Sequence, residues 1–539
     1  MRVLNQNTTI CSFKISLGNI QRLILAGLVA LVFSCLAATG ASAQASNVYI
    51  TPDGGGNGVC TNNVHSPSWF NNSGNWGSGA SQIGAGTIVH LCGTFGTNLT
   101  AQGGGQINNP ITILFESGAK FSTPAFVGCY IVLDNQSNIV VDGGAGGIIE
   151  NTANGSHLGN KVYTDAIRAI GSSNIEVKNL RIQNLYVHND VADDTLDGST
   201  FNCFLSTHPG GTISIHDNVM HDMNWCLKIG LFSNPGTVIS IYRNEIYNMD
   251  HGLALFGDTF DQSYTLNFHD NWIHDFANWD TTSNSYHHDG IHMYTGDGVR
   301  TFYNNKFSGS MGHNNTSYVF EEIVQGGTKG SNPGSSQVWY NNVWIQAPNN
   351  NISNALAFIT GNAAFYNNTF VCADSNGGDN QEGLRYNFGT GYYNSVPRHL
   401  TFENNVMSGC VTFLEGVNTI LDGFNFNVYS AATAGGQHKW SFNSTPSDSL
   451  SAWQSSTGKE ANSLYTNSSG LDGTGMPQPG SSALQAGTSL LNLGLNALAR
   501  DIHGVVRPTS GAWTAGAFES ASSVAAAPNP PSGLKATVN

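Results

Sequence analysis

Residues 286–292 read Tyr-His-His-Asp-Gly-Ile-His and concentrate side chains that can transfer protons. An imidazole beside a carboxylate can act as a general base, and two imidazoles with a carboxylate can also ligate a metal ion. The candidate catalytic residues of this segment are His288, Asp289 and His292. No fourth metal ligand is evident, so a metal site is left open, as is a purely structural role in hydrogen bonding.

Such chemistry needs a fold that places other groups beside this segment, and a repeat along the chain predicts one. From about residue 177 onward, short β-prone stretches end in Asn followed by an apolar residue, with a shortest interval of 26 residues, from Asn218 to Asn244. A period of this length with variable extensions is typical of a solenoid with loops inserted on one side. We predict one all-β domain with these residues at one corner: Asn218, Asn244, Asn271, Asn305, Asn342, Asn368 and Asn405.

One strand of each turn can be aligned by a small, an aliphatic, a variable and an apolar residue. Side chains alternate along a strand, so the variable residue faces outward, in a column that reads Arg168, Lys228, Ala254, His292 and Arg385. A second column, just before the small residue, reads Asp165, Trp225, His251, Asp289 and Glu382.

Aligned residues on neighbouring turns of a parallel stack lie about 4.8 Å apart. Asp250 and His251 are therefore predicted to share one patch with His288, Asp289 and His292, and Lys228 is expected about 10 Å from His292. Glu321 and Glu322 can add carboxylates to the same patch. Other residues of these types near the ladder Asn residues are interpreted as structural hydrogen-bonders, namely His216, His221, His269, His274 and Asp275.

The longest early insertion stands beside this patch. Nineteen residues separate Asn271 from Gly290, against 8 from Asn244 to Gly252. The insertion brings Trp279 and Tyr286, whose rings can stack on sugar faces, and functional loops of solenoids cluster on one face. We expect this insertion to form one wall of an open groove that contains Asp289 and His292. Replacing either residue by Ala is then expected to leave the thermal transition nearly intact, because exposed residues contribute little to the core. The candidate substrate-binding residues are Trp279, Tyr286, Arg168 and Arg385.

The Asn repeat resembles that of the pectate-lyase-like superfamily, over about residues 46–519. Residues 501–508, Asp-Ile-His-Gly-Val-Val-Arg-Pro, and 516–519, Gly-Ala-Phe-Glu, resemble the closing segment of exported β-helix proteins, although Thr514 stands where such endings usually carry Asp. The resemblance implies a right-handed single-stranded parallel β-helix. It also makes Ca²⁺ between acidic turn residues a possible cofactor.

The two ends of the chain differ from this domain. Residues 1–43 combine basic residues, an apolar run and the series Ala41-Ser42-Ala43, a pattern that predicts a cleaved signal peptide. The β-helix domain is then expected over residues 44–519, followed by an Ala, Pro and Ser-rich tail over 520–539. We predict a monomer that is secreted, periplasmic or on the cell surface, without a membrane span after cleavage.

Seven of the nine cysteines follow the predicted signal peptide, and an oxidising compartment permits disulfides between them. The spacings of Cys203 from Cys226 and of Cys372 from Cys410 resemble the repeat, so we predict these two disulfides between neighbouring turns. The pairing of Cys60, Cys92 and Cys129 is left open.

Charge and composition also limit the classes of molecule that this protein is expected to bind. A net charge of −15 with only 10% charged residues argues against a nucleic-acid partner, because no basic patch exists to release counterions. A polysaccharide is the expected partner. We favour a lyase that cleaves a uronate-containing glycan by β-elimination, with the base and the cations drawn from Lys228, His251 and His292.

Two alternatives stay open. An inverting glycoside hydrolase needs two carboxylates about 6.5 to 9.5 Å apart, for which Asp250 and Asp289 are candidates. A carbohydrate-binding or cell-surface β-helix without turnover is the third reading, because a fold alone does not imply catalysis.

Overall fold

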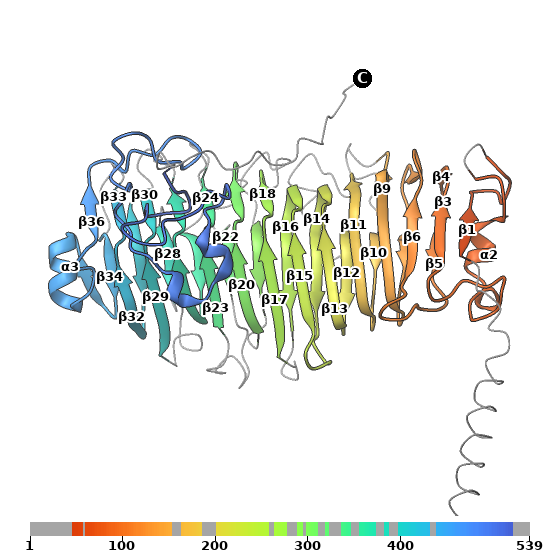
Figure 1. Cartoon of the computed structure of the whole chain (residues 1–539), viewed down its shortest axis with the longest axis horizontal. Helices are drawn as coiled ribbons and strands as arrows, with labels where there is room; N and C mark the ends of the chain where they lie inside the picture. Colours follow the sequence, from red (N-terminus) through yellow and green to blue (C-terminus); the bar gives the residue numbers. More distant parts are fainter. Residues whose placement is uncertain are drawn as a thin grey trace, which may run out of the picture.

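The chain forms a right-handed parallel β-helix, an elongated stack of turns (Figure 1). The computed structural model describes residues 46–57, 60–153, 163–185, 201–257, 263–276, 288–294, 298–310, 318–322, 336–346, 355–372, 382–386, 397–431 and 438–520. The predicted fold is thereby confirmed. The predicted signal peptide and residues 521–539 of the tail lie outside the described residues.

Successive turns pair strand on strand along three faces. The first face contains β5 (Leu99–Thr100), β8 (Gly128–Val132), β10 (Thr164–Arg168), β12 (Phe201–Thr207), the second halves of β14 (Val219–Gly230) and β16 (Glu245–Phe256), β19 (Asp289–Met293), β22 (Tyr318–Glu322), β25 (Ala355–Ile359), β28 (Glu382–Tyr386), β31 (Thr412–Gly416) and β34 (Trp440–Phe442). β34 also forms an antiparallel pair with β35 (Thr445–Ser447).

The second face begins with β1 (Asn47–Ile50), which β2 (Val64–His65) also joins. It continues through β3 (Ile88–Leu91), β6 (Ile111–Phe115), the first halves of β9 (Ser137–Asn151) and β11 (Ser173–Gln183), β13 (Gly210–His216), β15 (Val238–Tyr242), β17 (Tyr264–His269), β20 (Gly298–Tyr303), β23 (Ser336–Tyr340), β26 (Asn362–Tyr366), β29 (Arg398–Glu403) and β32 (Thr419–Asn425).

The third face contains β4 (Thr94–Phe95), β7 (Lys120–Thr123), the second halves of β9 and β11, the first halves of β14 and β16, β18 (Trp272–His274), β21 (Lys306–Ser308), β24 (Val343–Ile345), β27 (Thr369–Val371), β30 (Val406–Cys410), β33 (Val428–Ala431) and β36 (Leu464–Thr466). The described helices are short: α2 (Pro67–Phe70), α3 (Leu450–Thr457), η1 (Ser73–Asn75), η3 (Leu491–Leu493) and η4 (Asn496–Ala499).

The core lies inside the stack, where like side chains of neighbouring turns pile on one another. On the first face the inward column includes Leu227, Leu253 and Ile291, all fully buried. On the second face Phe302 and Trp339 stack with ring centroids 3.8 Å apart. Because no turn can bury its apolar face alone, the described turns share one continuous hydrophobic core.

A ladder of Asn side chains runs along the corner between the second and third faces, as predicted. All seven predicted residues are buried there. Asn305 is typical: its Oδ1 accepts from the backbone N of Asn271 at 3.0 Å, and its Nδ2 donates to the carbonyl of Phe268 at 2.9 Å. The left-handed conformation belongs to the preceding residue, such as Asn304 with φ 54°, and not to the ladder Asn itself. The ladder Asn thus satisfies backbone groups at each bend.

Replacing Asn305 by Ala is expected to lower the free energy of unfolding by about 2–3 kcal/mol, because it leaves a buried backbone donor and acceptor without these partners. Chemical denaturation measures this change. Asn492→Ala, at an exposed position of η3, is the control and should stay within about 0.5 kcal/mol of the parent. A loss in Asn305→Ala that also stays within about 0.5 kcal/mol would show that this ladder residue adds nothing to stability.

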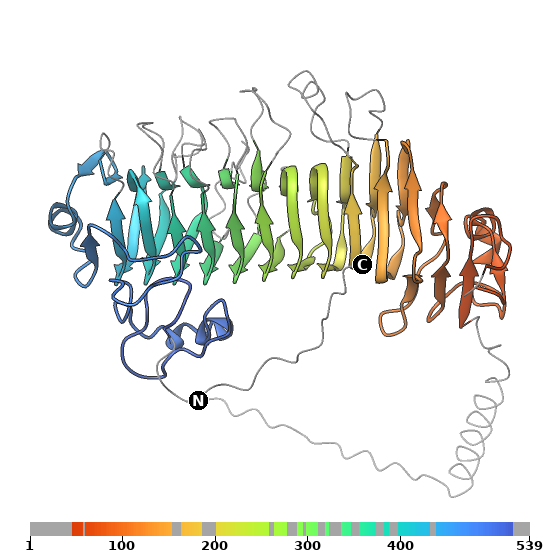
Figure 2. The same cartoon turned by 90° about the horizontal axis from the view of Figure 1, so that it is seen from above.

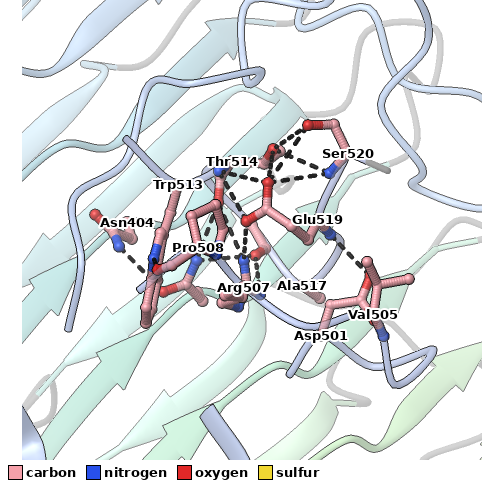
Figure 3. A network of polar contacts seen from close by, with 12 residues as sticks. Asn404, Asp501, Val505, Arg507, Pro508, Trp513, Thr514, Ala517, Glu519 and Ser520 are labelled. Carbon is pink, nitrogen blue, oxygen red and sulfur yellow. Dashed lines mark hydrogen bonds and ion pairs between the residues drawn. The ribbon is translucent and has the colours of Figure 1, made fainter. Parts of the chain in front are cut away.

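After β36 the chain folds back along the outside of the stack, as the blue segment in Figure 2 shows. We call residues 468–520 the closing segment. Within it, a network of polar contacts surrounds the buried Arg507 (Figure 3). Arg507 donates to Glu519 Oε2 at 3.2 Å and to Asn341 Oδ1 at 2.9 Å. Thr514, in the place of the usual Asp, donates from its hydroxyl to Glu519 Oε1 at 2.7 Å. The resemblance to exported β-helix endings therefore corresponds to a docked structure.

The closing segment binds to the stack through asparagines with positive φ, each of which stands one residue before a ladder Asn. Asn367 Nδ2 donates to the carbonyls of Thr514 and Gly516, each at 3.1 Å. Asn404 Nδ2 donates to the carbonyl of Thr488 at 2.7 Å. Trp513 is buried in the same interface, packed with Tyr340 of β23. One segment thus contacts several successive turns.

Of the two predicted disulfides, one is formed and one is not. Cys372–Cys410 is formed, as predicted, and Cys60–Cys92 is a second bond that spacing had left open. Cys203 and Cys226 are not bonded, although they face each other on adjacent turns with sulfur atoms 3.2 Å apart. That separation exceeds the roughly 2.05 Å of a disulfide, so repeat spacing brought the two thiols together without joining them.

Candidate functional site

The strand register confirms the predicted columns of the first face. His251 of β16 pairs with Asp289 of β19, and Ala254 pairs with His292. His292 in turn pairs with Glu321 of β22. The predicted patch is therefore formed by adjacent turns, and we call Asp250, His251, His288, Asp289, His292 and Glu321 the His–carboxylate cluster.

Asp250 holds one half of this cluster. Its Oδ1 lies 2.6 Å from Nδ1 of His288, and its Oδ2 lies 2.9 Å from Nδ1 of His251. The indole Nε1 of Trp225, one turn earlier, donates to Oδ2 at 3.0 Å. One carboxylate thus orients two imidazoles through the same ring nitrogen, which is how carboxylates fix the tautomer of catalytic histidines.

The other half converges on Asp289. Its Oδ2 lies 3.3 Å from Nε2 of His251 and 2.9 Å from Nδ1 of His292, and these two nitrogens lie 3.1 Å apart. Nε2 of His292 lies 3.4 Å from Glu321 Oε2. The rings of His251 and His292 are stacked, and the ring of Tyr294 stacks on that of His292 with the ring centroids 3.9 Å apart. Two imidazole nitrogens and one carboxylate oxygen from adjacent turns therefore meet in one small triangle.

Burial corrects the expectation of an open groove. His292 and Asp289 are 0% exposed, and His251 is 4% exposed. His292 alternates with the core residues Ile291 and Met293, but the alternation of a strand does not tell what covers a residue. We therefore expect alanine at Asp289 or His292 to lower the thermal transition, contrary to the expectation from the sequence, because buried charged groups lose their partners on truncation.

Charge in the cluster follows from its contacts. Burial opposes ionisation of Asp250, but His251 and His288 outweigh it and hold the pKa of that carboxyl well below its usual range. Burial likewise opposes a charge on His251, but Asp250 and Asp289 raise its pKa to about 9. For Glu321, burial and the charge of Asp289 both raise the pKa well above the usual value. At neutral pH an ionised Asp250 and a cationic His251 therefore lie side by side, next to Glu321, whose raised pKa favours the neutral form.

The remaining candidates lie farther away or have other partners. Lys228 lies two strand pairings from His292, as predicted, with its Nζ 4.6 Å from the ring centre of Trp225. Arg168 lies four pairings away and binds Asp134 at 2.7 Å. Arg385 lies three pairings away on the other side, 3.5 Å from Glu415. Trp279 and Tyr286 lie outside the described residues, so the predicted wall is untested.

Glu322 does not join the cluster, in contrast to its neighbour Glu321. It is buried and forms an ion pair with the buried Arg300 of β20. Gln337 Nε2 and the backbone N of Gly361 donate to its Oε2, each at 2.8 Å. Glu322 is therefore a structural carboxylate that links several turns.

Other His–Asp pairs bond within one dipeptide. In His216-Asp217, His221-Asp222, His269-Asp270 and His274-Asp275, Nδ1 lies 2.5–2.7 Å from the carboxylate of the next residue. Each of these Asp residues has a positive φ, so the pair belongs to a local bend, as the structural interpretation of these histidines predicts. His288 instead binds the carboxylate of a different turn, which separates the cluster from this local motif.

Sequence reasoning missed two contributors. Trp225 stood in the second column but was given no role, although its indole bonds to Asp250. Tyr294 follows the aligned strand by one residue, and its position alone does not show the stacking on His292. Aromatic residues in or next to a column of titratable groups were the available signal.

The chain matches no family model, and no curated protein sequence is significantly similar to it. Among the described residues, no helix is long and apolar enough to span a membrane.

The ligand atoms of the cluster do not fit the Ca²⁺ that the resemblance suggests, because Ca²⁺ takes six to eight oxygen ligands and the cluster is rich in imidazole nitrogen. The geometry of the cluster is therefore the basis for any functional proposal.

Proposed function

We propose that this chain is a secreted polysaccharide lyase that cleaves a uronate-containing glycan by β-elimination, on a fold similar to that of the pectate-lyase-like superfamily. The observation that carries the proposal is the pairing of His288 Nδ1 with Asp250 Oδ1 at 2.6 Å, next to the cationic His251. An oriented base beside positive charge is what the elimination requires.

In the proposed reaction a base removes the proton at C5 of the uronate. The C–H electron pair forms the C4–C5 double bond, the C4–O bond breaks, and the leaving oxygen takes up a proton. With its Nδ1 held by Asp250, His288 is assigned as the base through Nε2. Because His288 is 1% exposed, the proposal requires this face to open when the glycan binds. His251 and Lys228 supply positive charge for the uronate carboxylate, and Glu321, whose pKa is raised by burial and by Asp289, is the proton donor for the leaving oxygen.

The alternative of an inverting hydrolase has less support from the geometry. Such an enzyme needs space for a water molecule between two carboxylates about 6.5 to 9.5 Å apart. Here the imidazole of His251 lies between Asp250 and Asp289, 2.9 Å from one and 3.3 Å from the other. A purely structural role is also less favoured, because burying several ionisable groups costs stability that an apolar column would not.

A polysaccharide panel tests the proposal. Purified protein is incubated with acidic and neutral glycans while reducing ends and the absorbance of unsaturated uronates are both followed. Both signals are expected to rise together on at least one acidic glycan, because each elimination creates one new end and one new double bond. New reducing ends without the absorbance would identify a hydrolase, and neither signal on any glycan would favour a binding protein.

A further inference from the structure

We propose that His251, Asp289 and His292 form a binding site for a divalent transition-metal ion of the Zn²⁺ type. The inference deepens the proposed lyase and rests on it only for the role of the ion, because the site itself follows from the geometry. Nε2 of His251, Nδ1 of His292 and Oδ2 of Asp289 are the ligand atoms.

The spacing of these atoms fits neighbouring ligands of one ion. They lie 3.1, 3.3 and 2.9 Å from one another. Ligands bound at about 2.0–2.2 Å in tetrahedral or octahedral geometry are about 2.9–3.5 Å apart. A point about 1 Å out of the plane of the triangle lies at about 2.0–2.2 Å from all three atoms, which is the ligand distance of such an ion.

The second nitrogen of His251 provides an independent argument. Metal-binding histidines characteristically direct their other ring nitrogen to a carboxylate, which fixes the ring and makes it a better ligand. Nδ1 of His251 lies 2.9 Å from Asp250 and has this arrangement, whereas Nε2 of His292 lies 3.4 Å from Glu321 without a hydrogen bond between the two atoms. Because a ligating imidazole is neutral, the ion takes the place of the proton on Nε2 of His251. A cation between the three atoms then interacts with all of them at once.

The donor set and its charge select the kind of ion. Two imidazole nitrogens and one carboxylate oxygen suit Zn²⁺ and similar ions, whereas Mg²⁺ and Ca²⁺ prefer oxygen ligands. The formal charge of the ion balances the two carboxylates of Asp250 and Asp289 in a buried setting, where unbalanced charge is costly.

Three protein ligands leave a coordination position for substrate, as in catalytic zinc sites. A uronate carboxylate is the group that would occupy it. The bound ion then supplies the positive charge that the proposed elimination otherwise takes from His251. His288 is not one of the ligands, so the base and the cation remain separate parts of the site.

Zinc binding to metal-free, full-length protein, measured by calorimetry without substrate, tests the site. We expect one high-affinity Zn²⁺ per chain, and Ca²⁺ at the same concentration should not compete. Asp289→Asn and His292→Ala should each weaken binding more than 100-fold, and Asp250→Asn about 10- to 100-fold. His269→Ala removes the imidazole of a local His–Asp pair on another face and should bind Zn²⁺ like the parent.

Co²⁺ provides a second readout, because its visible spectrum reports nitrogen ligation directly. The band should appear in the parent and in His269→Ala and be absent in Asp289→Asn, a near-isosteric change that limits any effect of misfolding. No binding in the parent, or equal binding in parent and ligand variants, would overturn the inference. Zinc bound at this site without any lyase product would refute the lyase alone, whereas full-rate lyase activity in verified metal-free protein would refute the role of the ion and retain the lyase.

Discussion

Replacing His288 by Ala is expected to reduce kcat on the preferred acidic glycan by about 10²- to 10⁴-fold, the usual contribution of a positioned general base. The reason is the contact of Nδ1 with Asp250 at 2.6 Å, which orients the ring, while Nε2 takes the proton at C5 in the proposed reaction. The initial rate of unsaturated-uronate formation measures the effect. KM should change much less, because the base acts mainly on the transition state.

His274→Ala is the matched control, since His274 is similarly buried but bonds to its own neighbour Asp275 at 2.7 Å. It should keep nearly the parental kcat. His288→Ala should also retain Zn²⁺ binding, which distinguishes loss of the base from collapse of the site. Parental turnover in a folded His288→Ala protein would exclude this residue as the base.

Replacing Glu322 by Ala is expected to lower the free energy of unfolding by about 3–5 kcal/mol, the cost of leaving a buried charge without its partner. Arg300, which is 0% exposed, loses its ion pair, and the backbone N of Gly361 and the amide of Gln337 lose an acceptor. Denaturant unfolding followed by far-ultraviolet circular dichroism measures the change.

Glu415→Ala is the control, because Glu415 is partly exposed and lies 3.5 Å from Arg385 in a weaker pair. Its loss should cost no more than about 1 kcal/mol. Similar losses in the two variants would mean that burial of the Arg300 pair has no special effect. A second variant, Arg300→Met with Glu322→Leu, should recover much of the stability, since removing both charges also removes the unpaired one.

The fold was predictable because the same structural requirement recurs in every turn and therefore leaves a repeat in the sequence. Each bend leaves backbone groups to be satisfied, and an Asn at each bend does so, which made Asn218 to Asn405 visible as a series. The register of the first face was predictable for a similar reason, since small and aliphatic residues recur at fixed positions of each aligned strand. This register was sufficient to predict that Asp250, His251, Asp289 and His292 lie together.

What the repeat does not encode could not be predicted in this way. The burial of His292 depends on what packs over an outward column, which alternation does not specify. Cys60–Cys92 lies before the Asn repeat begins, so no period indicated the pairing. Bond formation between Cys203 and Cys226 depends on fractions of an ångström, which spacing along the chain cannot resolve.

The docked closing segment changes how the end of this molecule can open. A stack whose turns touch only their neighbours can fray from its last turn inward, one turn at a time. Here Arg507, Thr514 and Thr488 are bound to asparagines of three successive turns, Asn341, Asn367 and Asn404. Opening the final turns therefore requires release of contacts well inside the stack. A protease should find the C-terminal turns as resistant as the middle of the molecule, with cleavage limited by a single large opening rather than by progressive peeling.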